Sequence, residues 1–218
     1  TRQPAGTDNQ FGQMSILSPY MLAIYYQRTS TACIAFLLVI ATTHNASASD
    51  NLWDVLKNGG KVVLMRHAPV ERGSGSGDPL LRDPSCRSER NLSALGKRNA
   101  EVVGNRFRER HIPVSKVLHS PYCRTTDTAR IAFGKASPAE YLSLIEISGP
   151  DEAAQQTETL NNVIASYAGK GNLILVTHEP NINAVSFELM SHLDILVIDP
   201  KGEGEFEELG VIRFSESE

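Results

Sequence analysis

Residues 61–70 read KVVLMRHAPV, an apolar run that stops abruptly at an arginine and a histidine. Residues 173–182 read LILVTHEPNI, in which a second apolar run also stops at a histidine. Unbroken apolar runs of this length are typical of central strands that are covered on both faces. Because ligands of parallel sheets bind beyond the carboxyl ends of the strands, we expect Arg66, His67 and His178 to share a site.

The segments around these two runs favour alternating helices and strands. Helices are expected at residues 51–57, 93–110, 125–133, 152–167 and 182–190. Further strands are expected at residues 117–119, 141–145, 195–198 and 206–214, with a flexible loop at 71–90. This alternation predicts an α/β fold, a three-layer sandwich with a mostly parallel central sheet and helices on both faces.

The beginning of the chain has a different pattern from the rest. Residues 1–13 are interpreted as a tag or upstream read-through, and residues 14–48 as a secretory signal peptide. Arg28 precedes an apolar run at 32–41, and the small residues that follow resemble a cleavage site. The run is shorter than the ~20 residues that span a bilayer, although an uncleaved anchor is the alternative. We therefore expect one exported, periplasmic domain over residues 49–218, with no stable membrane insertion after cleavage.

Charge is distributed unevenly along the chain. Residues 66–130 carry 13 basic and seven acidic residues, whereas residues 131–218 carry four basic and 15 acidic residues. The formal net charge is −4, and nucleic-acid-binding domains are usually basic overall. A local excess of arginine in an acidic chain instead favours a small anionic ligand, and no nucleic-acid partner is expected.

Two of the three cysteines, Cys86 and Cys123, lie within the expected mature domain. In an exported protein they are expected to form a disulfide, because the compartment is oxidising. Neither C-x-x-C nor H-x-x-x-H spacing is present, so the sequence predicts no metal site and no cofactor.

The residues at the strand ends fit the chemistry of phosphoryl transfer. A neutral imidazole at His67 is suited to act as a nucleophile. Arg66 and Arg124 offer planar guanidinium groups that match phosphate oxygens, and His178 can hold a further oxygen if it is protonated. A carboxylic acid is then needed to protonate the leaving oxygen and later to activate water.

Three motifs taken together resemble those of the histidine phosphatase superfamily, which has the phosphoglycerate-mutase-like fold. They are R-H at 66–67, S-P-x-x-R-T-x-x-T-A at 120–129 and V-T-H at 176–178. The segment RNLSALGK at 90–97 is also similar to the family's L-[ST]-x-x-G motif. The resemblance covers about residues 62–182. It is greatest for small exported members, including lipopolysaccharide core heptose-phosphate phosphatases.

The resemblance implies that His67 is the phosphohistidine nucleophile. It also implies that Arg66, Arg124 and His178 form the phosphate pocket. The family's usual R-H-G is R-H-A here, which makes the backbone beside the nucleophile less free. His192 belongs to none of the motifs and is interpreted as structural or solvated.

The general acid has two candidates within the resemblance. One branch of the family takes it from a glutamate after the third strand, here Glu146. Another branch takes it from the residue directly after the second histidine, here Glu179, and the H-E-x-N sequence at 178–181 favours this second pattern. Arg72 and Arg90 are candidate substrate contacts, with plain surface charge as the alternative for each.

The sequence therefore predicts a metal-independent phosphomonoester hydrolase that works through a phosphohistidine. The expected partner is a small phosphorylated envelope or periplasmic substrate such as a sugar phosphate. A phosphomutase of the same family and a non-catalytic phosphoryl-binding module are the alternatives. A protein-phosphohistidine phosphatase is disfavoured, because the known substrates of that class are cytoplasmic. The sequence indicates no oligomeric state.

Overall fold

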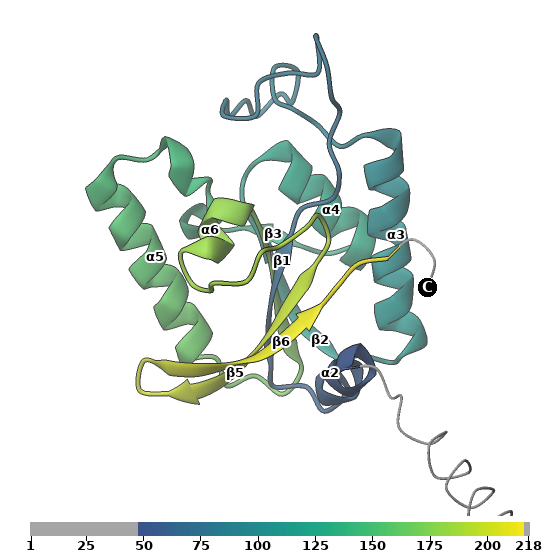
Figure 1. Ribbon diagram of the computed structural model, residues 1–218, viewed down its shortest axis with the longest axis vertical. Coiled ribbons are helices and arrows are strands. Elements are labelled where there is room, and N and C mark those ends of the chain that lie inside the picture. The colour runs from purple at the N-terminus through teal and green to yellow at the C-terminus, as the bar shows by residue number, and fades with distance from the viewer. Residues whose placement is uncertain (1–47, 216–218) are drawn as a thin grey trace, which may run out of the picture. The chain divides into compact units, whose positions relative to one another are not determined.

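The computed structural model describes residues 48–215 of the chain (Figure 1). The expected tag and almost all of the expected signal peptide lie outside the described residues, so those assignments stay predictions. Within residues 48–215, no helix combines the length and the apolar character that crossing a membrane requires.

A mixed sheet of six strands forms the centre of the described domain (Figure 1). In sheet order the strands are β3 (Ser137–Pro138), β2 (Val114–His119), β4 (Asn172–Thr177), β1 (Val62–Arg66), β5 (Ile195–Gly202) and β6 (Glu205–Ile212). The strands from β3 to β1 are parallel, whereas β5 runs antiparallel to β1 and forms a hairpin with β6. The two apolar runs that end in histidine are therefore neighbours, with Arg66 opposite Thr177.

Helices cover both faces of the sheet. One face carries α2 (Ala48–Lys57), α3 (Ala94–Glu109) and α4 (Cys123–Phe133), and the other carries α5 (Pro150–Ala165) and α6 (Glu179–Asn183). Figure 1 shows α3 and α5 on opposite sides of the strands. Successive residues of β1 point to opposite faces, so Val63 and Met65 pack with the first helix layer and Val62 and Leu64 with the second. The predicted three-layer α/β fold is confirmed.

The strand predicted at residues 141–145 is wrong. Two 3-10 helices, η1 (Glu140–Leu142) and η2 (Ile145–Ile147), occupy this segment. Leu142 and Leu144 of this segment are buried, and Leu142 packs in the core cluster that contains Leu160 and Ile164 of α5. The backbone of this segment bonds to a side chain rather than to a neighbouring strand: Asn181 Nδ2 donates to Ser143 O at 2.7 Å.

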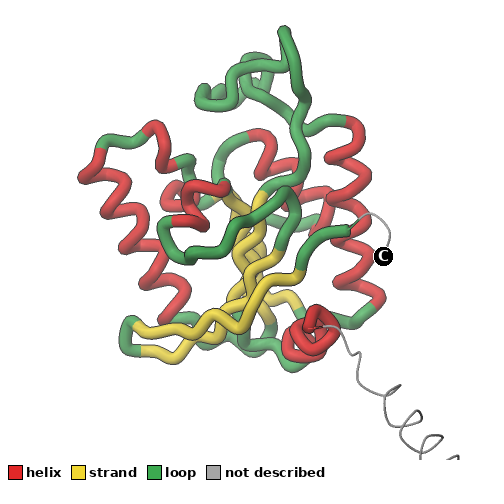
Figure 2. The backbone as a smooth tube through the Cα atoms, in the orientation of Figure 1, coloured by secondary structure: helices red, strands yellow, loops and turns green. Residues whose placement is uncertain are grey.

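The helix predicted at residues 182–190 is also wrong. Helix α6 ends at Asn183, and the chain then continues without a helix or strand until β5 (Figure 2). Backbone groups of this segment bond to side chains instead of forming helical bonds: Arg66 Nη1 donates to Met190 O at 2.6 Å, and Glu188 N donates to Ser186 Oγ at 3.1 Å. Tertiary contacts therefore override the helical spacing of its apolar residues.

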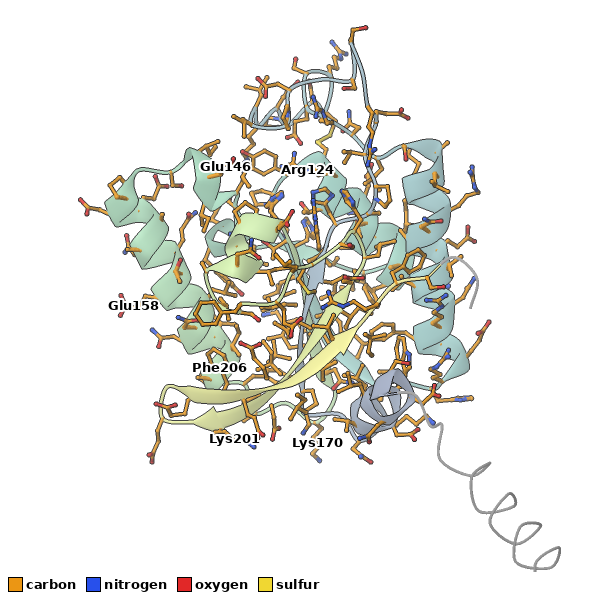
Figure 3. All side chains as sticks on the ribbon, viewed as in Figure 1. Arg124, Glu146, Glu158, Lys170, Lys201 and Phe206 are labelled. Atoms are coloured by element: carbon orange, nitrogen blue, oxygen red, sulfur yellow. A yellow bond between two sulfur atoms is a disulfide. The ribbon has the colours of Figure 1, made fainter. Side chains whose placement is uncertain are left out.

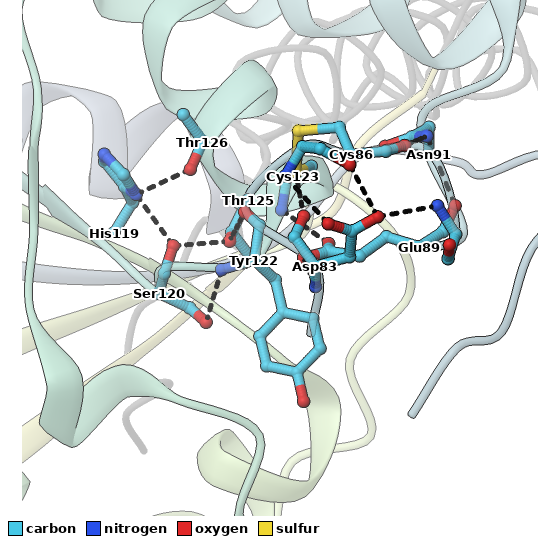
Figure 4. The surroundings of a disulfide bond; sticks show 12 residues. Asp83, Cys86, Glu89, Asn91, His119, Ser120, Tyr122, Cys123, Thr125 and Thr126 are labelled. Carbon is cyan, nitrogen blue, oxygen red and sulfur yellow. Dashed lines mark hydrogen bonds between the residues drawn. A yellow bond between two sulfur atoms is a disulfide. The ribbon is translucent and has the colours of Figure 1, made fainter. Parts of the chain in front are cut away.

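The predicted disulfide between Cys86 and Cys123 is present, with the two Cα atoms 5.8 Å apart (Figure 4). It joins the glycine-rich loop after β1 to the first residue of α4. Glu89, only 1% exposed, supports this junction, because its carboxylate accepts N–H bonds from Asp83 at 2.9 Å and from Cys123 at 2.7 Å. The flexible loop expected at residues 71–90 is thus anchored next to Arg124.

Candidate active site

A cleft of about 930 Å³ lies at the carboxyl ends of β1 and β4. Its walls include all the residues predicted as catalytic or phosphate-binding, namely Arg66, His67, Arg124, Glu146, His178 and Glu179. Arg90 lines the cleft as well, whereas Arg72 is exposed and does not line it. Figure 3 shows Arg124 and Glu146 at the same end of the sheet. The structure brings these residues together, and their individual roles stay predictions.

The imidazole of His67 is neutral, and one of its two nitrogens has no hydrogen-bond partner among the described residues. Nδ1 lies 2.8 Å from Ala68 O, and because a carbonyl only accepts, Nδ1 carries the proton. Burial of the ring, which is 7% exposed, and next the charge of Arg124 together lower the pKa of His67 to about 3. Nε2 is therefore unprotonated at neutral pH and available as a nucleophile.

Helix α4 fixes the backbone that orients this ring. The amide of Ala68 donates to Thr128 Oγ1 at 3.0 Å, and that hydroxyl donates to Arg124 O at 2.7 Å. The amide of His67 itself donates to Thr177 O at 3.0 Å, on the neighbouring strand β4. The nucleophile candidate is thus attached to both segments that supply the rest of the site.

His178 is neutral in this structure and has partners on both ring nitrogens. Arg124 Nη2 lies 3.2 Å from Nδ1, so Nδ1 must accept and Nε2 carries the proton. Nε2 then donates to Ser120 Oγ at 2.8 Å. Burial first, and then the charge of Arg124, hold the pKa of His178 well below its usual range. A protonated His178 that holds a phosphate oxygen would require Arg124 to leave Nδ1.

Arg124 is buried with an unused donor. The side chain is 4% exposed and its guanidinium lies over the ring of Tyr122, 4.5 Å from the ring centre. Among the described residues, its buried Nη1 has no hydrogen-bond partner. A buried N–H without a partner costs free energy, and an anion in the cleft would remove that cost. The start of α4 adds the positive end of a helix dipole at the same place.

The two acid candidates differ in how their carboxylates are held. Arg66 Nη1 lies 2.6 Å from Glu179 Oε2, so Glu179 is engaged in an ion pair. The buried Nε of Arg66 has no partner within the described part of the chain. Glu146 is exposed on η2, and no residue between 48 and 215 forms an ion pair or hydrogen bond with its carboxylate.

Two further residues of the site were not predicted from the sequence. His192 was interpreted as structural or solvated, but it lines the cleft, and its ring centre lies 5.3 Å from that of His67. It follows residues 182–190, whose apolar spacing predicted a helix that does not form, so the sequence pattern did not place it in the cleft. Ser120 lies within the S-P-x-x-R motif, but its contact with His178 joins residues 58 positions apart and becomes visible only in the fold.

No group of three histidine, cysteine, aspartate or glutamate side chains is placed to hold a metal ion within residues 48–215.

The buried histidines make a testable prediction about stability. The pKa values of His67, His178 and His192 are all lowered, to about 3 for His67 and about 4 for His192, with burial as the main cause. Below the ordinary value of 6.5 the unfolded chain binds protons that the folded chain does not bind. Stability therefore falls as the pH drops from 7 to 5, by up to about 1.4 kcal/mol per pH unit for each of His67 and His178, and by less for His192, which solvent screens more.

Urea unfolding at several pH values between 7 and 5 measures this effect, in a range above the ordinary pKa of carboxylic acids. His67→Asn removes one of the titrating groups and is expected to make the dependence shallower. His111→Asn, at an exposed position outside the cleft, serves as the matched control. Equal slopes for the wild-type protein and His67→Asn would contradict the prediction.

Comparisons with known proteins show a partial match to one family model and a shared fold. The model of the histidine phosphatase superfamily (branch 1) matches residues 62–152. No curated protein matches the chain. The structure of the protein histidine phosphatase SixA complexed with tungstate is similar, with a TM-score of 0.51 and 15% identity, covering 70% of this chain and 96% of the other.

A second solved structure is equally similar. Phosphoserine phosphatase from Entamoeba histolytica, in complex with 3-phosphoglyceric acid, has a TM-score of 0.52 and 13% identity, covering 72% of this chain and 98% of the other. At such low identity these two structures show a shared fold.

Proposed function

We propose that this chain, which is similar to the histidine phosphatase superfamily (branch 1) over residues 62–152, hydrolyses phosphomonoesters through a phosphohistidine at Nε2 of His67. One observation carries the proposal. The bond from Nδ1–H to Ala68 O leaves a buried, neutral imidazole with a free lone pair. That ring lies in the same cleft as Arg66 and Arg124, each of which has a buried N–H without a partner among the described residues.

The reaction proceeds in two displacement steps. The lone pair of Nε2 attacks phosphorus, the bond between phosphorus and the ester oxygen breaks, and a carboxylic acid gives its proton to the leaving oxygen. Water then attacks the phosphorus of phosphohistidine, the carboxylate takes a proton from that water, and the P–N bond breaks to release phosphate. The guanidinium groups of Arg66 and Arg124 meet the charge on the non-bridging oxygens, so the proposed reaction requires no metal ion.

We assign the general acid to Glu146 rather than to Glu179. A general acid must hold a proton and reach the leaving oxygen, and the ion pair with Arg66 occupies Glu179. Glu146 lines the cleft with a carboxylate that forms no ion pair within the described residues. The H-E-x-N sequence favoured Glu179 as the general acid, whereas the proposal favours Glu146.

Leaving-group dependence tests this assignment. Glu146→Gln is expected to slow a poor leaving group, such as an alkyl or sugar phosphate, about a hundredfold, and an activated aryl phosphate much less, because only the poor leaving group needs the proton. Glu179→Gln is expected to slow both substrates by a similar factor, since it removes the partner of Arg66. Steady-state rates on the two substrates measure the difference. The reverse pattern would return the acid to Glu179.

We further propose that the substrate is a small phosphorylated molecule outside the cytoplasm. The surplus of arginine in residues 66–130 supports an anionic ligand, and a cleft of about 930 Å³ has room for a sugar phosphate. The disulfide between Cys86 and Cys123 supports an exported, periplasmic protein, because disulfides persist in oxidising compartments.

Hydrolysis of an aryl phosphate in excess EDTA, from acidic to neutral pH, tests the proposed function. We expect phosphate release that survives chelation. Loss of activity on chelation, restored by a divalent metal, would contradict the metal-independent mechanism. An isomerised phosphoester without phosphate release would indicate the mutase. Binding of vanadate without turnover on a panel of phosphoesters would indicate the binding module.

A further inference from the structure

The turn at residues 191–194 is built in an unusual backbone conformation. Leu193 is a buried, non-glycine residue with a φ of 65°, in the left-handed region. Two bonds fix the turn to the end of β1: Leu193 N donates to Arg66 O at 3.1 Å, and Arg66 N donates to Asp194 O at 3.4 Å. The turn is thus attached to the residue that immediately precedes the nucleophile.

The side chain of Asp194 holds this conformation in place. Its carboxylate is 2% exposed and accepts from Ser191 N at 2.9 Å, from Phe214 N at 2.8 Å and from Arg213 Nη1 at 2.9 Å. A strained residue persists only where its surroundings over-determine it, and such residues cluster at functional sites. The position of this turn is therefore held by several independent contacts.

These contacts hold His192 at the cleft. Its half-buried ring lines the cleft, 5.3 Å from the ring of His67 between their centres. Burial, together with the charges of Arg66 and Arg72, lowers the pKa of His192 to about 4, so the ring is neutral with one N–H and one lone pair. Neither ring nitrogen has a hydrogen-bond partner among residues 48–215.

His67 has two histidine neighbours whose hydrogen bonding differs. The ring of His178 lies 5.6 Å away between ring centres, and its two nitrogens are bonded to Ser120 and Arg124. The ring of His192 lies at a similar distance, and its nitrogens have no partner among residues 48–215. A phosphoryl group in front of Nε2 would therefore meet an unengaged donor in His192.

We propose that His192 donates a ring N–H to a non-bridging oxygen of the phosphoryl group, an inference that rests on the proposed function. The leaving oxygen departs in line with the nucleophile, on the far side of phosphorus from Nε2. Because His192 lies beside the ring of His67, it is placed for the oxygens that every phosphomonoester shares, rather than for the leaving group. Its contribution is therefore independent of the substrate.

The test compares the full chain with its variants His192→Phe and His192→Asn. Phenylalanine keeps a flat ring against His67 but has no N–H, whereas asparagine keeps an N–H donor. We expect His192→Phe to weaken the binding of inorganic phosphate about tenfold to a hundredfold. It is expected to lower kcat/KM by the same factor on an aryl phosphate and on a sugar phosphate. His192→Asn is expected to recover most of both losses.

The controls separate this inference from the proposed function. His111→Asn, at an exposed position, is expected to leave both measurements unchanged. Wild-type activity with unchanged phosphate binding in His192→Phe would overturn the inference alone. A loss on only one of the two substrates would also overturn it, because it would place His192 at the leaving group. A wild-type protein that neither binds phosphate nor hydrolyses any ester would overturn the proposed function and the inference with it.

A second measurement decides the question if His192→Phe folds poorly. The ¹⁵N chemical shifts of His192 in the wild-type protein report the state of each ring nitrogen. We expect phosphate to shift the protonated nitrogen, and shifts that do not change at saturating phosphate would overturn the inference.

Discussion

His67→Asn is expected to lower kcat by about ten-thousandfold or more, because it removes the only group that can form the covalent intermediate in the proposed mechanism. Asparagine keeps an N–H that can donate to Ala68 O, so the backbone around residue 67 should stay in place. Phosphate release from an aryl ester measures the loss, and the melting temperature reports whether the fold is retained.

His111→Asn makes the same replacement at an exposed histidine and should retain full activity. A folded His67→Asn variant that keeps more than about a hundredth of wild-type kcat would contradict the role of His67 as nucleophile. In that case a water molecule or another side chain would have to attack phosphorus.

Arg124→Leu is expected to lower kcat/KM about a hundredfold to a thousandfold, since it removes a buried donor aimed at charge on the phosphoryl oxygens. Arg124→Lys should recover little, because an ammonium cannot reproduce the planar pair of donors or the stacking on Tyr122. The measurement is kcat/KM together with the dissociation constant for inorganic phosphate.

The same helix offers a matched control for this prediction. Arg130 lies in the last turn of α4 and is exposed, so Arg130→Leu makes the identical change outside the cleft. It should leave kcat/KM within about twofold of wild type, since removal of an exposed charge near a helix end has a small effect. Equal losses for the two variants would show that α4 is generally sensitive, and that Arg124 has no special role.

The central sheet and the convergence of the site could be predicted because both follow from local patterns. Unbroken apolar runs require burial on both faces, and the direction of parallel strands brings Arg66, His67 and His178 to one edge. The disulfide followed from the number of cysteines and the expected compartment. None of these inferences depends on the conformation of an individual side chain.

The remaining features depend on contacts between distant residues, which no local pattern contains. The apolar residues at 141–145 fit a strand or a buried 3-10 turn, and the contact of Asn181 with the backbone there exists only in the folded chain. The ring nitrogens of His178 form hydrogen bonds with Ser120 and Arg124, and the carboxylate of Glu179 forms an ion pair with Arg66. A helical pattern after α6 concealed the turn that places His192 in the cleft.

The most direct test of the account is to trap the covalent intermediate. The full chain would be mixed with an ester labelled in its phosphoryl group, quenched in alkali during turnover, digested and mapped by mass spectrometry. A phosphoryl group on a histidine nitrogen survives alkali and is lost in acid. The account predicts an acid-labile label on the peptide that contains His67, absent from His67→Asn. Active enzyme with no label at His67, or with the label on another residue, would contradict it.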